Sequence, residues 1–329
     1  MISLNDYLYE GDTVLKILHR YYGDLKEEAY QTNSSVDKLH CDFLLQQIDL
    51  LEHNDFLTSQ SQRLREFYKY MTDEYPTLAF TFKGRIKSLL RSEQKFNGNI
   101  VENVYEYYTE NKKFPSVEQL QQRMGIIRDL IAYRIVLSIP KCHLKEGENR
   151  EKKEQRYLYE IANALPEFLK DKGFSAKIYK MPETSPSEAI DKKLRPYYRD
   201  YIKNPSFNGY RSLHITFYDN YSGSYLEVQI RTKEMDDYAE IGPAHHLGYE
   251  KKQEEERRRR DQIPKGECLY FDEAYERGIL LQQLDLSKID VNMFSAVNNQ
   301  LVNDGCGLYR GRLILPYEHL SRFQNDIID

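Results

Sequence analysis

Two neighbouring segments near the middle of the chain carry polar side chains at every second residue. In the stretch 208–232, NGYRSLHITFYDNYSGSYLEVQIRT, apolar and polar residues alternate, which predicts two β-strands joined by the turn DNYSGS. One face of this hairpin is apolar and must be covered by other parts of the protein. The opposite face carries groups that could do chemistry, namely Ser212, His214, Thr216, Tyr225, Glu227, Gln229 and Arg231.

Each of these groups has an ordinary structural interpretation beside the functional one. A carboxylate in the middle of a strand, such as Glu227, is disfavoured unless its face is wet or its charge is paired, and a solvated face would explain it. His214 taken singly is typical of a histidine satisfied at a sheet edge. Tyr210 follows the turn residues Asn208 and Gly209, where its ring could stack on a planar ligand, although packing is commoner.

A second carboxylate, Asp129, opens the apolar segment DLIAYRIVL, which is predicted to be a strand. An acidic residue at this position is often only a cap or a turn former. The functional alternative is an oxygen ligand for Mg²⁺, which takes one or two carboxylates from a protein and keeps several waters.

Basic residues gather in KGRIKSLLRSEQK, where Gly84 precedes Arg85 and Lys87 and Lys95 follows two turns later. The pattern predicts a loop that enters a helix, and backbone amides at a helix start attract phosphate. A guanidinium fork and compact ammonium groups suit a triphosphate. Spacing alone favours an ordinary solvated basic helix.

Three further tracts have more than one interpretation. The pair His245 and His246, with Glu240 and Glu250 nearby, matches no zinc spacing, so a metal site is not expected there. The run EEERRRR favours a solvated helix with ion pairs four residues apart. In DKKLRPYYRDYIKN, basic residues alternate with tyrosines, which suits a nucleic-acid surface or the rim of a nucleotide pocket equally well; these basic residues are Lys192, Lys193, Arg195, Arg199 and Lys203.

Composition narrows the class of protein. The chain has 329 residues, enough for one large or two modest domains, and its net charge of −5 argues against a general polyanion binder. Four distant cysteines without CxxC spacing indicate neither a disulfide framework nor a zinc knuckle. No signal-peptide pattern and no membrane-spanning apolar run are expected, so the sequence predicts a soluble, cytoplasmic protein without membrane partners.

The elements that must position these residues can be outlined from periodicity. Helices are predicted over residues 1–75, over most of 84–125 with breaks at Gly98 and Pro115, and over 150–171. Strands are predicted at LIAYRIVLSI, SAKIYKM, the hairpin and GRLILPY. We therefore expect an α/β or α+β fold with helical additions at both ends, divided into 1–75, 76–252 and 253–329.

Taken together, five ordered motifs resemble the synthetase domain of the RelA/SpoT family over residues 80–252: GRIK…K, RDLIAYRIV, YIKNPSFNGYRSLH, LEVQIRT and AEIGPAHHLGYE. The resemblance implies a nucleotidyltransferase-like mixed sheet flanked by helices. It also implies transfer of pyrophosphate from ATP to the 3′-hydroxyl of GDP or GTP, which makes the alarmone (p)ppGpp and releases AMP.

The resemblance also implies a role for each matching residue. Arg85, Lys87 and Lys95 would hold the ATP phosphates. Asp129 would bind Mg²⁺, and Glu227 would be a second metal ligand or the base that activates the hydroxyl. On the acceptor side Tyr210 would stack on guanine, and His214, Gln229 and Arg231 would shape the pocket.

The sequence departs from the family pattern at several points. Ser206 stands where the family commonly has a lysine before NGY, so the acceptor preference is open, with Lys203 or Arg211 as substitutes. The family's tryptophan after its histidine is replaced by Leu247, and there is no HD dipeptide of the hydrolase domain. These features resemble a stand-alone small synthetase that could form homo-oligomers. Two alternatives are a toxin-type enzyme that modifies the 3′ end of tRNA and a silent nucleotide-binding regulator.

Overall fold

The computed structural model describes residues 1–8, 14–52, 55–87, 89–179, 185–206, 208–240, 254–255, 257–284, 308–309 and 312–314. Within these ranges only the backbone is described for residues 55–58, 61, 83, 85, 240, 308–309 and 312–314. The chain forms two compact units that interleave along the sequence. Unit 1 comprises Met1–Asn54, Lys87–Ile127 and Lys251–Ile314, and unit 2 comprises Asp55–Ile86, Arg128–Glu250 and Leu315–Asp329. The sequence predicted three consecutive segments with boundaries at residues 75 and 252. Those boundaries are not tested by the two interleaved units and stay predictions.

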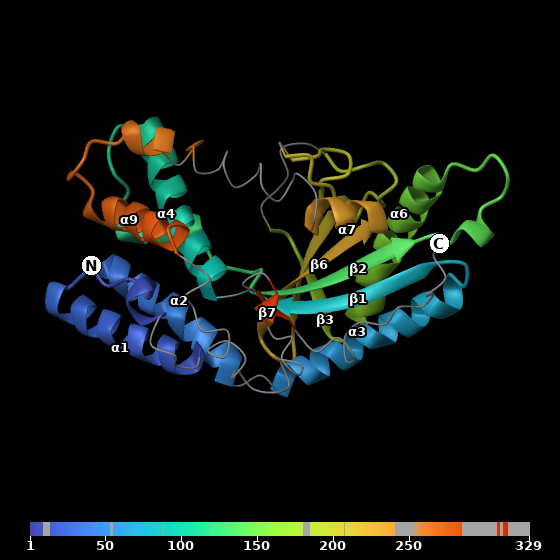
Figure 1. Cartoon of the computed structure of the whole chain (residues 1–329), viewed down its shortest axis with the longest axis horizontal. Coiled ribbons are helices and arrows are strands. Elements are labelled where there is room, and N and C mark those ends of the chain that lie inside the picture. Colours follow the sequence, from blue (N-terminus) through green and yellow to red (C-terminus); the bar gives the residue numbers. More distant parts are fainter. Residues whose placement is uncertain are drawn as a thin grey trace. The chain divides into compact units, whose positions relative to one another are not determined.

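Unit 1 is mainly helical (Figure 1). Its elements are η1 (Leu4–Tyr7), α1 (Val14–Thr32), α2 (Ser35–Glu52), α4 (Leu89–Asn111), α5 (Val117–Met124), α9 (Leu269–Gln282), and the short antiparallel strands β7 (Leu308–Tyr309) and β8 (Arg312–Ile314). Helix α1 packs on α2, and α4 packs on α9. The ends of helix α5 are set by residues at its two caps. Ser116 and Gln119 form a capping box, and Gly125 takes a positive φ of 58° at the end.

The core of unit 1 contains a buried polar cluster. The His40 imidazole Nε2 on α2 lies 2.5 Å from one carboxylate oxygen of Glu93 on α4, and both side chains are almost fully buried. The ring of Phe96 stacks on His40 at 4.5 Å between centroids. Arg277 on α9 donates to Asp37 at 3.3 Å and to the backbone oxygen of Ile2 at 3.0 Å. Four separate segments are therefore fixed to one another by polar contacts as well as by apolar packing.

Unit 2 is built on a mixed sheet of six strands. These are β1 (Ala79–Ile86), β2 (Ile131–Ser138), β3 (Phe174–Lys177), β4 (Tyr198–Asp200), β5 (Leu213–Asp219) and β6 (Ser224–Thr232). The order is β3-β5-β6-β2-β1, with β4 also pairing on β5. Only β2 and β6 are parallel; the other pairs are antiparallel. The helices are α3 (Asp55–Glu74), α6 (Arg150–Lys170) and α7 (Lys233–Glu240), and short 3₁₀ turns occur at Lys141–His143 and Arg195–Tyr197.

The two faces of this sheet are covered differently. Leu213, Ile215, Phe217 and their partners on β6 are fully buried, and α6 packs against β2, β3 and β6. Helix α7 lies on the polar side, where it contacts β2 and β6 (Figure 1). The alternation in the sequence therefore separates an apolar face under α6 from a polar face beside α7.

Most of the expected elements are confirmed. The mixed sheet flanked by helices, the hairpin, the helix over 150–171 and the helical first 75 residues all occur, and β8 confirms the strand expected at GRLILPY as far as the described residues extend. The ion pairs Arg258–Glu254 and Arg259–Glu255 are present, whereas Arg260 pairs with Asp272, and Glu256 lies outside the described residues. Among the described residues, no helix is both long and apolar enough to cross a bilayer.

Two expectations about residues 84–125 are wrong. Residues 84–86 belong to strand β1, which pairs with β2, so Arg85 lies in a strand and not at a helix start. Helix α4 also continues through Gly98. A glycine costs a helix only about 1 kcal/mol, and the buried side chains of Phe96, Ile100 and Val101 on either side outweigh that cost.

Candidate functional site

The strand register brings the polar residues of three strands onto one face. Across β5 and β6, His214 lies opposite Gln229 and Thr216 lies opposite Glu227. Across the parallel pair β2 and β6, Arg134 lies beside Gln229. Because directly paired residues point to the same side of a sheet, these side chains form one continuous surface. It is buried: Glu227 and Gln229 are each 5% exposed and Arg231 is 2% exposed.

Glu227 is at the centre of this polar face. Its Oε2 accepts from Arg199 Nη2 at 2.6 Å and lies 3.3 Å from His214 Nδ1, and its Oε1 accepts from the Gln229 amide at 2.7 Å. Burial alone would raise the pKa of the Glu227 carboxyl. The His214 ring, the Arg199 guanidinium and the Gln229 amide together hold that pKa well below its ordinary value. Glu227 is therefore a carboxylate anion at neutral pH.

His214 connects Glu227 to Tyr210. Its Nε2 lies 2.8 Å from the Tyr210 hydroxyl, and the ring of Tyr201 packs edge-on at 5.1 Å between centroids. Burial lowers the pKa of His214 more than the nearby carboxylate of Glu227 raises it, and Arg199 and Arg231 lower it further. The imidazole is therefore neutral at pH 7, with its two nitrogens directed at Tyr210 and Glu227.

The network continues through Arg231 to α7. Arg231 donates to Gln229 Oε1 at 2.7 Å, to the Tyr210 hydroxyl, and to Asp236 Oδ1 at 3.2 Å. Arg134 on β2 shares the same Asp236 oxygen at 2.8 Å. One carboxylate on α7 thus fixes two guanidinium groups on the sheet, which holds them rigidly in position.

Tyr210 is held by the turn that precedes it. Ser206 Oγ donates to Asn208 Oδ1 at 2.5 Å, and Gly209 N donates to the Ser206 backbone oxygen at 2.8 Å. Gly209 has a φ of 76°, which strains any residue with a Cβ, and a Cβ there would lie 2.7 Å from the Tyr238 hydroxyl, so the turn favours glycine. The turn therefore fixes the direction from which the Tyr210 ring enters the site.

The structure places the predicted acceptor residues together: His214, Gln229, Arg231 and Tyr210 are all in direct contact with the Glu227 network. Lys203 is different. Its ammonium group donates to the backbone oxygens of Ser185 at 3.0 Å and Pro186 at 3.3 Å, which fixes the loop before β4. A role for Lys203 in acceptor binding stays a prediction.

The predicted phosphate-binding residues are spread over both units. Arg85 lies in β1 with its backbone beside Ala132, and its side chain lies outside the described residues. Lys87 follows β1, and Lys95 lies in α4; both are half-buried and belong to unit 1. Arg91 and Lys95 are four residues apart on α4, so they share one side of the helix. Binding of ATP by these residues stays a prediction, and His245 and His246 lie outside the described residues.

The carboxylates suit a metal ion that arrives with its substrate. Asp129, which is half-buried, precedes β2 by two residues, and the register places Glu227 beside Ala132 at the start of the same strand. Among the described residues, no group of three or more His, Cys, Asp or Glu side chains could hold a metal by itself. Mg²⁺ needs only one or two protein carboxylates when phosphate oxygens supply the remaining ligands, so the donor set fits this ion.

Three further residues contact the polar face and do not stand out individually in the sequence. Arg199 was seen only as part of a basic tract, although it makes the shortest contact to Glu227. Arg134 and Asp236 lie in segments whose pattern predicts elements and not a site. Arg134 falls in the middle of the segment IAYRIVLS, and a charge inside an otherwise apolar strand is a signal that could have been used.

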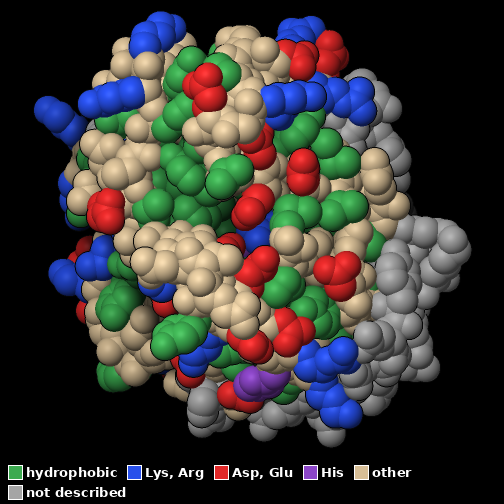
Figure 2. All heavy atoms as spheres, turned by 90° about the vertical axis from the view of Figure 1, so that its left-hand side faces the viewer, with side chains coloured by type: hydrophobic (Ala, Val, Ile, Leu, Met, Phe, Trp, Pro, Cys, Tyr) green, Lys and Arg blue, Asp and Glu red, His purple; other side chains and the backbone are tan. Residues whose placement is uncertain are grey.

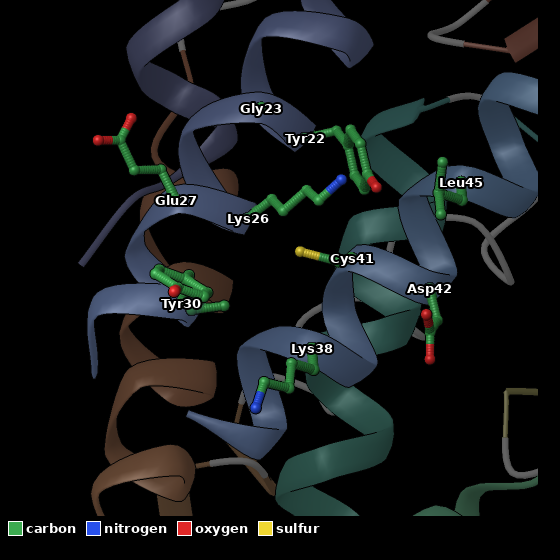
Figure 3. Close-up of a pocket in the computed structure, with 10 residues that line it drawn as sticks. Tyr22, Gly23, Lys26, Glu27, Tyr30, Lys38, Cys41, Asp42 and Leu45 are labelled. Carbon is green, nitrogen blue, oxygen red and sulfur yellow. The ribbon is translucent and has the colours of Figure 1, made fainter. Parts of the chain in front are cut away.

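A groove of about 540 Å³ lies elsewhere, between α1 and α2 (Figure 3). Lys26 and Tyr22 from α1 and Cys41 and Leu45 from α2 point into the space between the helices. Burial raises the pKa of the Cys41 thiol to about 11, so the sulfur is protonated and poorly nucleophilic. On the face drawn in Figure 2, hydrophobic side chains gather around a hollow and charged ones surround them. The lining of the groove includes carboxylates and lysines but neither an imidazole nor a guanidinium group, unlike the sheet face.

Comparison with known proteins gives a match to one family model in the central segment. Residues 101–254 match the model of a region found in RelA and SpoT proteins. A probable chloroplastic GTP diphosphokinase of Arabidopsis thaliana is 55% identical over 51 residues, and a GTP pyrophosphokinase of Haemophilus influenzae is 45% identical over 58 residues. These matches span 16% and 18% of this chain and only 7% and 8% of those longer proteins.

Among solved structures, small alarmone synthetase 2 of Bacillus subtilis aligns over 73% of this chain and 98% of its own, with 19% identity and a TM-score of 0.31. Small alarmone synthetase 1 of the same organism aligns over 70% and 89%, with 18% identity and a TM-score of 0.31.

Proposed function

We propose, from the match of residues 101–254 to a region found in RelA and SpoT proteins, that this chain transfers pyrophosphate from ATP to the 3′-hydroxyl of GDP or GTP. The observation that carries the proposal is the buried carboxylate of Glu227, held by Arg199, His214 and Gln229 on a face with two further arginines. Such a face can receive a nucleotide and stabilise charge that moves between phosphate oxygens.

In the proposed reaction, the 3′-hydroxyl oxygen forms a bond to the β-phosphorus of ATP. The bond between that phosphorus and the α,β-bridging oxygen breaks, AMP leaves, and the hydroxyl proton is released through Glu227 to solvent. A carboxylate with a lowered pKa is a weak base. We therefore assign Glu227 chiefly to orienting the hydroxyl, so that proton loss accompanies bond formation.

The remaining residues bind and position the reactants. Arg85, Lys87 and Lys95 hold the ATP phosphates, and Asp129 with Glu227 holds Mg²⁺, which when bound would neutralise phosphate oxygens. Tyr210 stacks on the acceptor base. The neutral His214 holds the Tyr210 hydroxyl, and Gln229 and Arg231 keep the acceptor side polar. These contacts reduce the entropic cost of aligning two nucleotides.

A second acceptor is favoured by one specific observation. Ser206 uses its hydroxyl within the turn, Lys203 is engaged by two backbone oxygens, and Arg211 pairs with Glu151 at 3.3 Å. These three residues at the acceptor turn therefore offer little uncommitted positive charge for a 5′-triphosphate. A terminal nucleotide of tRNA carries a single phosphodiester at its 5′ side, and we propose it as the alternative acceptor.

Label transfer tests both versions. Purified protein with Mg²⁺ and ATP labelled on the β- and γ-phosphates is offered GDP, GTP or deacylated tRNA in separate reactions. Label in a guanosine tetra- or pentaphosphate supports the first proposal, and label on tRNA supports the second. Retained ATP binding without transfer to any acceptor contradicts both and indicates a silent nucleotide-binding protein.

A variant tests the phosphate assignment separately. Lys87→Ala should raise the concentration of ATP needed for half-maximal transfer, because one cation is lost from the triphosphate site. The exposed Lys193, outside the assigned site, provides the matched control Lys193→Ala. An unchanged ATP requirement in Lys87→Ala removes this residue from the phosphate site.

A further inference from the structure

A row of aromatic and basic side chains crosses the polar face of unit 2 beyond Glu227. It consists of Lys177, Tyr218, Tyr225, Arg128, Tyr179 and Arg199, which we call the aromatic–cationic strip. The Lys177 ammonium lies 5.7 Å from the centre of the Tyr218 ring, and the Tyr218 and Tyr225 rings are 5.0 Å apart. The Arg128 guanidinium lies 4.7 Å from the Tyr225 ring and 5.4 Å from the Tyr179 ring, and Arg199 lies 5.1 Å from Tyr179.

The strand register explains why these residues share a face. Tyr218 is paired with Tyr225 across β5 and β6, and Lys177 on β3 is paired with Thr216. Paired residues point to the same side, so Lys177, Tyr218 and Tyr225 lie on the side of Glu227. Arg128 comes from the segment before β2 and donates to the backbone oxygen of Ile178, which fixes it beside Tyr179.

All six residues are partly exposed, Arg199 with only 12% of its side chain, so the strip is held in place and its other members are reachable from solvent. Neighbouring Ile178 is 48% exposed. Arg199 pairs with Glu227, whereas the described contacts of Lys177 and Arg128 include no carboxylate. The strip thus presents positive charge and ring surfaces together. If the basic groups served only to pair with carboxylates of the protein, the tyrosine rings beside them would have no role.

We propose that this strip binds single-stranded nucleic acid. Phosphates of the strand contact the basic groups, and bases stack on the tyrosine rings and guanidinium planes, which is how proteins bind single strands without reading sequence. The strip contains three rings and three basic groups in one row, which suits several successive nucleotides better than one mononucleotide. Contacts within the protein already orient the rings and guanidinium groups, so less side-chain freedom is lost when the strand binds. This surface goes beyond the proposed activity, and it does not require that activity.

Fluorescence anisotropy with a short labelled oligonucleotide, in the absence of ATP, tests the proposal. Wild-type protein should bind at about 50 mM salt and more weakly at about 200 mM. The logarithmic slope should be near −1.4, at about −0.7 each for Lys177 and Arg128, the two cations that are not paired with a carboxylate. Lys177→Gln should make the slope shallower by about 0.7. RNA and DNA oligonucleotides of one sequence show which strand is preferred, and binding of either supports the strip.

The tyrosines provide the sharper test. Tyr218→Leu should weaken binding roughly 5- to 150-fold, the range expected for loss of one stacked base, and Tyr218→Phe should restore it. The control is Tyr30→Leu, because Tyr30 is 86% exposed on unit 1 and should not matter. Thermal unfolding checks that each variant is folded, and Tyr179→Leu replaces Tyr218→Leu if the latter is not.

Three results would overturn the proposal: no binding by wild type at low salt, equal binding by wild type and the strip variants, or equal losses in Tyr30→Leu and Tyr218→Leu. Displacement by an acidic peptide as effectively as by an unlabelled oligonucleotide would also overturn it, since the strip would then be a site for acidic protein segments. Because ATP is absent, failure of pyrophosphate transfer in a separate assay does not affect these outcomes.

Discussion

Arg199 Nη2 lies 2.6 Å from Glu227 Oε2, so the carboxylate at the centre of the polar face is paired with a guanidinium from β4, which reaches across the intervening strand β5. Both side chains are largely buried, with 12% and 7% exposed. A buried pair is costly to break by removing one partner, because the remaining charge is left without compensation. This contact therefore matters for stability and for the charge state of Glu227.

Arg199→Gln should lower the free energy of unfolding by about 3–5 kcal/mol. The matched control is Arg211→Gln, since the Arg211–Glu151 pair is exposed and should contribute less than about 1 kcal/mol. Urea denaturation at neutral pH measures both. Equal losses of unfolding free energy in the two variants would show that the buried pair stabilises the protein no more than the exposed pair.

His214 should make stability depend on pH in a defined range. Its folded-state pKa is lowered from 6.5, so the unfolded chain binds the proton more readily than the native protein. Stability from this group is therefore complete above about pH 6.5 and is lost as pH falls from there towards the lowered pKa. The difference in unfolding free energy between wild type and His214→Gln should shrink over that range. A constant difference across it would contradict a buried, neutral His214.

The hairpin itself could be predicted from the sequence because alternation over two strands specifies the register and both faces at once. The arrangement of His214, Glu227, Gln229 and Arg231 on one side follows directly from that pattern. Arg199 and Asp236 could not be assigned in this way. They reach the face from β4 and α7, which lie outside the alternating sequence of the hairpin although their side chains contact it. The periodicity of one segment does not predict its contacts with another element.

The local pattern also fails to predict the strand at Ala79–Ile86, because this strand depends on pairing with another element. Glycine at position 84 and lysines on either side of Arg85 read as a loop before a basic helix, whereas backbone pairing with β2 over eight residues holds the segment extended. Tertiary context also carries α4 through Gly98. The phosphate-binding roles of Lys87 and Lys95 depend on contacts that local sequence does not define.

Asp219 should protect the protein against acid. Burial alone raises the pKa of this carboxyl, but hydrogen bonds from Arg63, Ser222 and Gln60 bring it below its ordinary value. Stability from Asp219 is therefore present above about pH 4 and is lost as pH falls through the lowered pKa. Asp219→Asn should lower stability at pH 7 and flatten its dependence on pH below about 4. The control Asp73→Asn, at an exposed position on α3, should change neither.

Two histidine–glutamate pairs of similar length allow a comparison of burial in unit 1. His40 and Glu93 are 0% and 1% exposed, whereas His19 and Glu52, 2.7 Å apart, are 50% and 39% exposed. Glu93→Ala should destabilise the protein by about 3–5 kcal/mol, and Glu52→Ala by less than about 1 kcal/mol. Thermal or urea unfolding of the two variants measures the difference. A larger effect at Glu52 would contradict the role of the buried cluster.

The central claim is that Glu227 supports transfer of pyrophosphate without being needed to hold the nucleotides. Glu227→Gln retains the size and one oxygen acceptor of the side chain and removes its charge. The decisive measurement is transfer of label from β,γ-labelled ATP to GDP, GTP or tRNA by wild type and Glu227→Gln, with ATP binding measured in parallel. We predict transfer by wild type to at least one acceptor, and transfer at least 100-fold slower in the variant with ATP binding largely intact. Undiminished transfer in Glu227→Gln would contradict the assignment of the polar face as the active site.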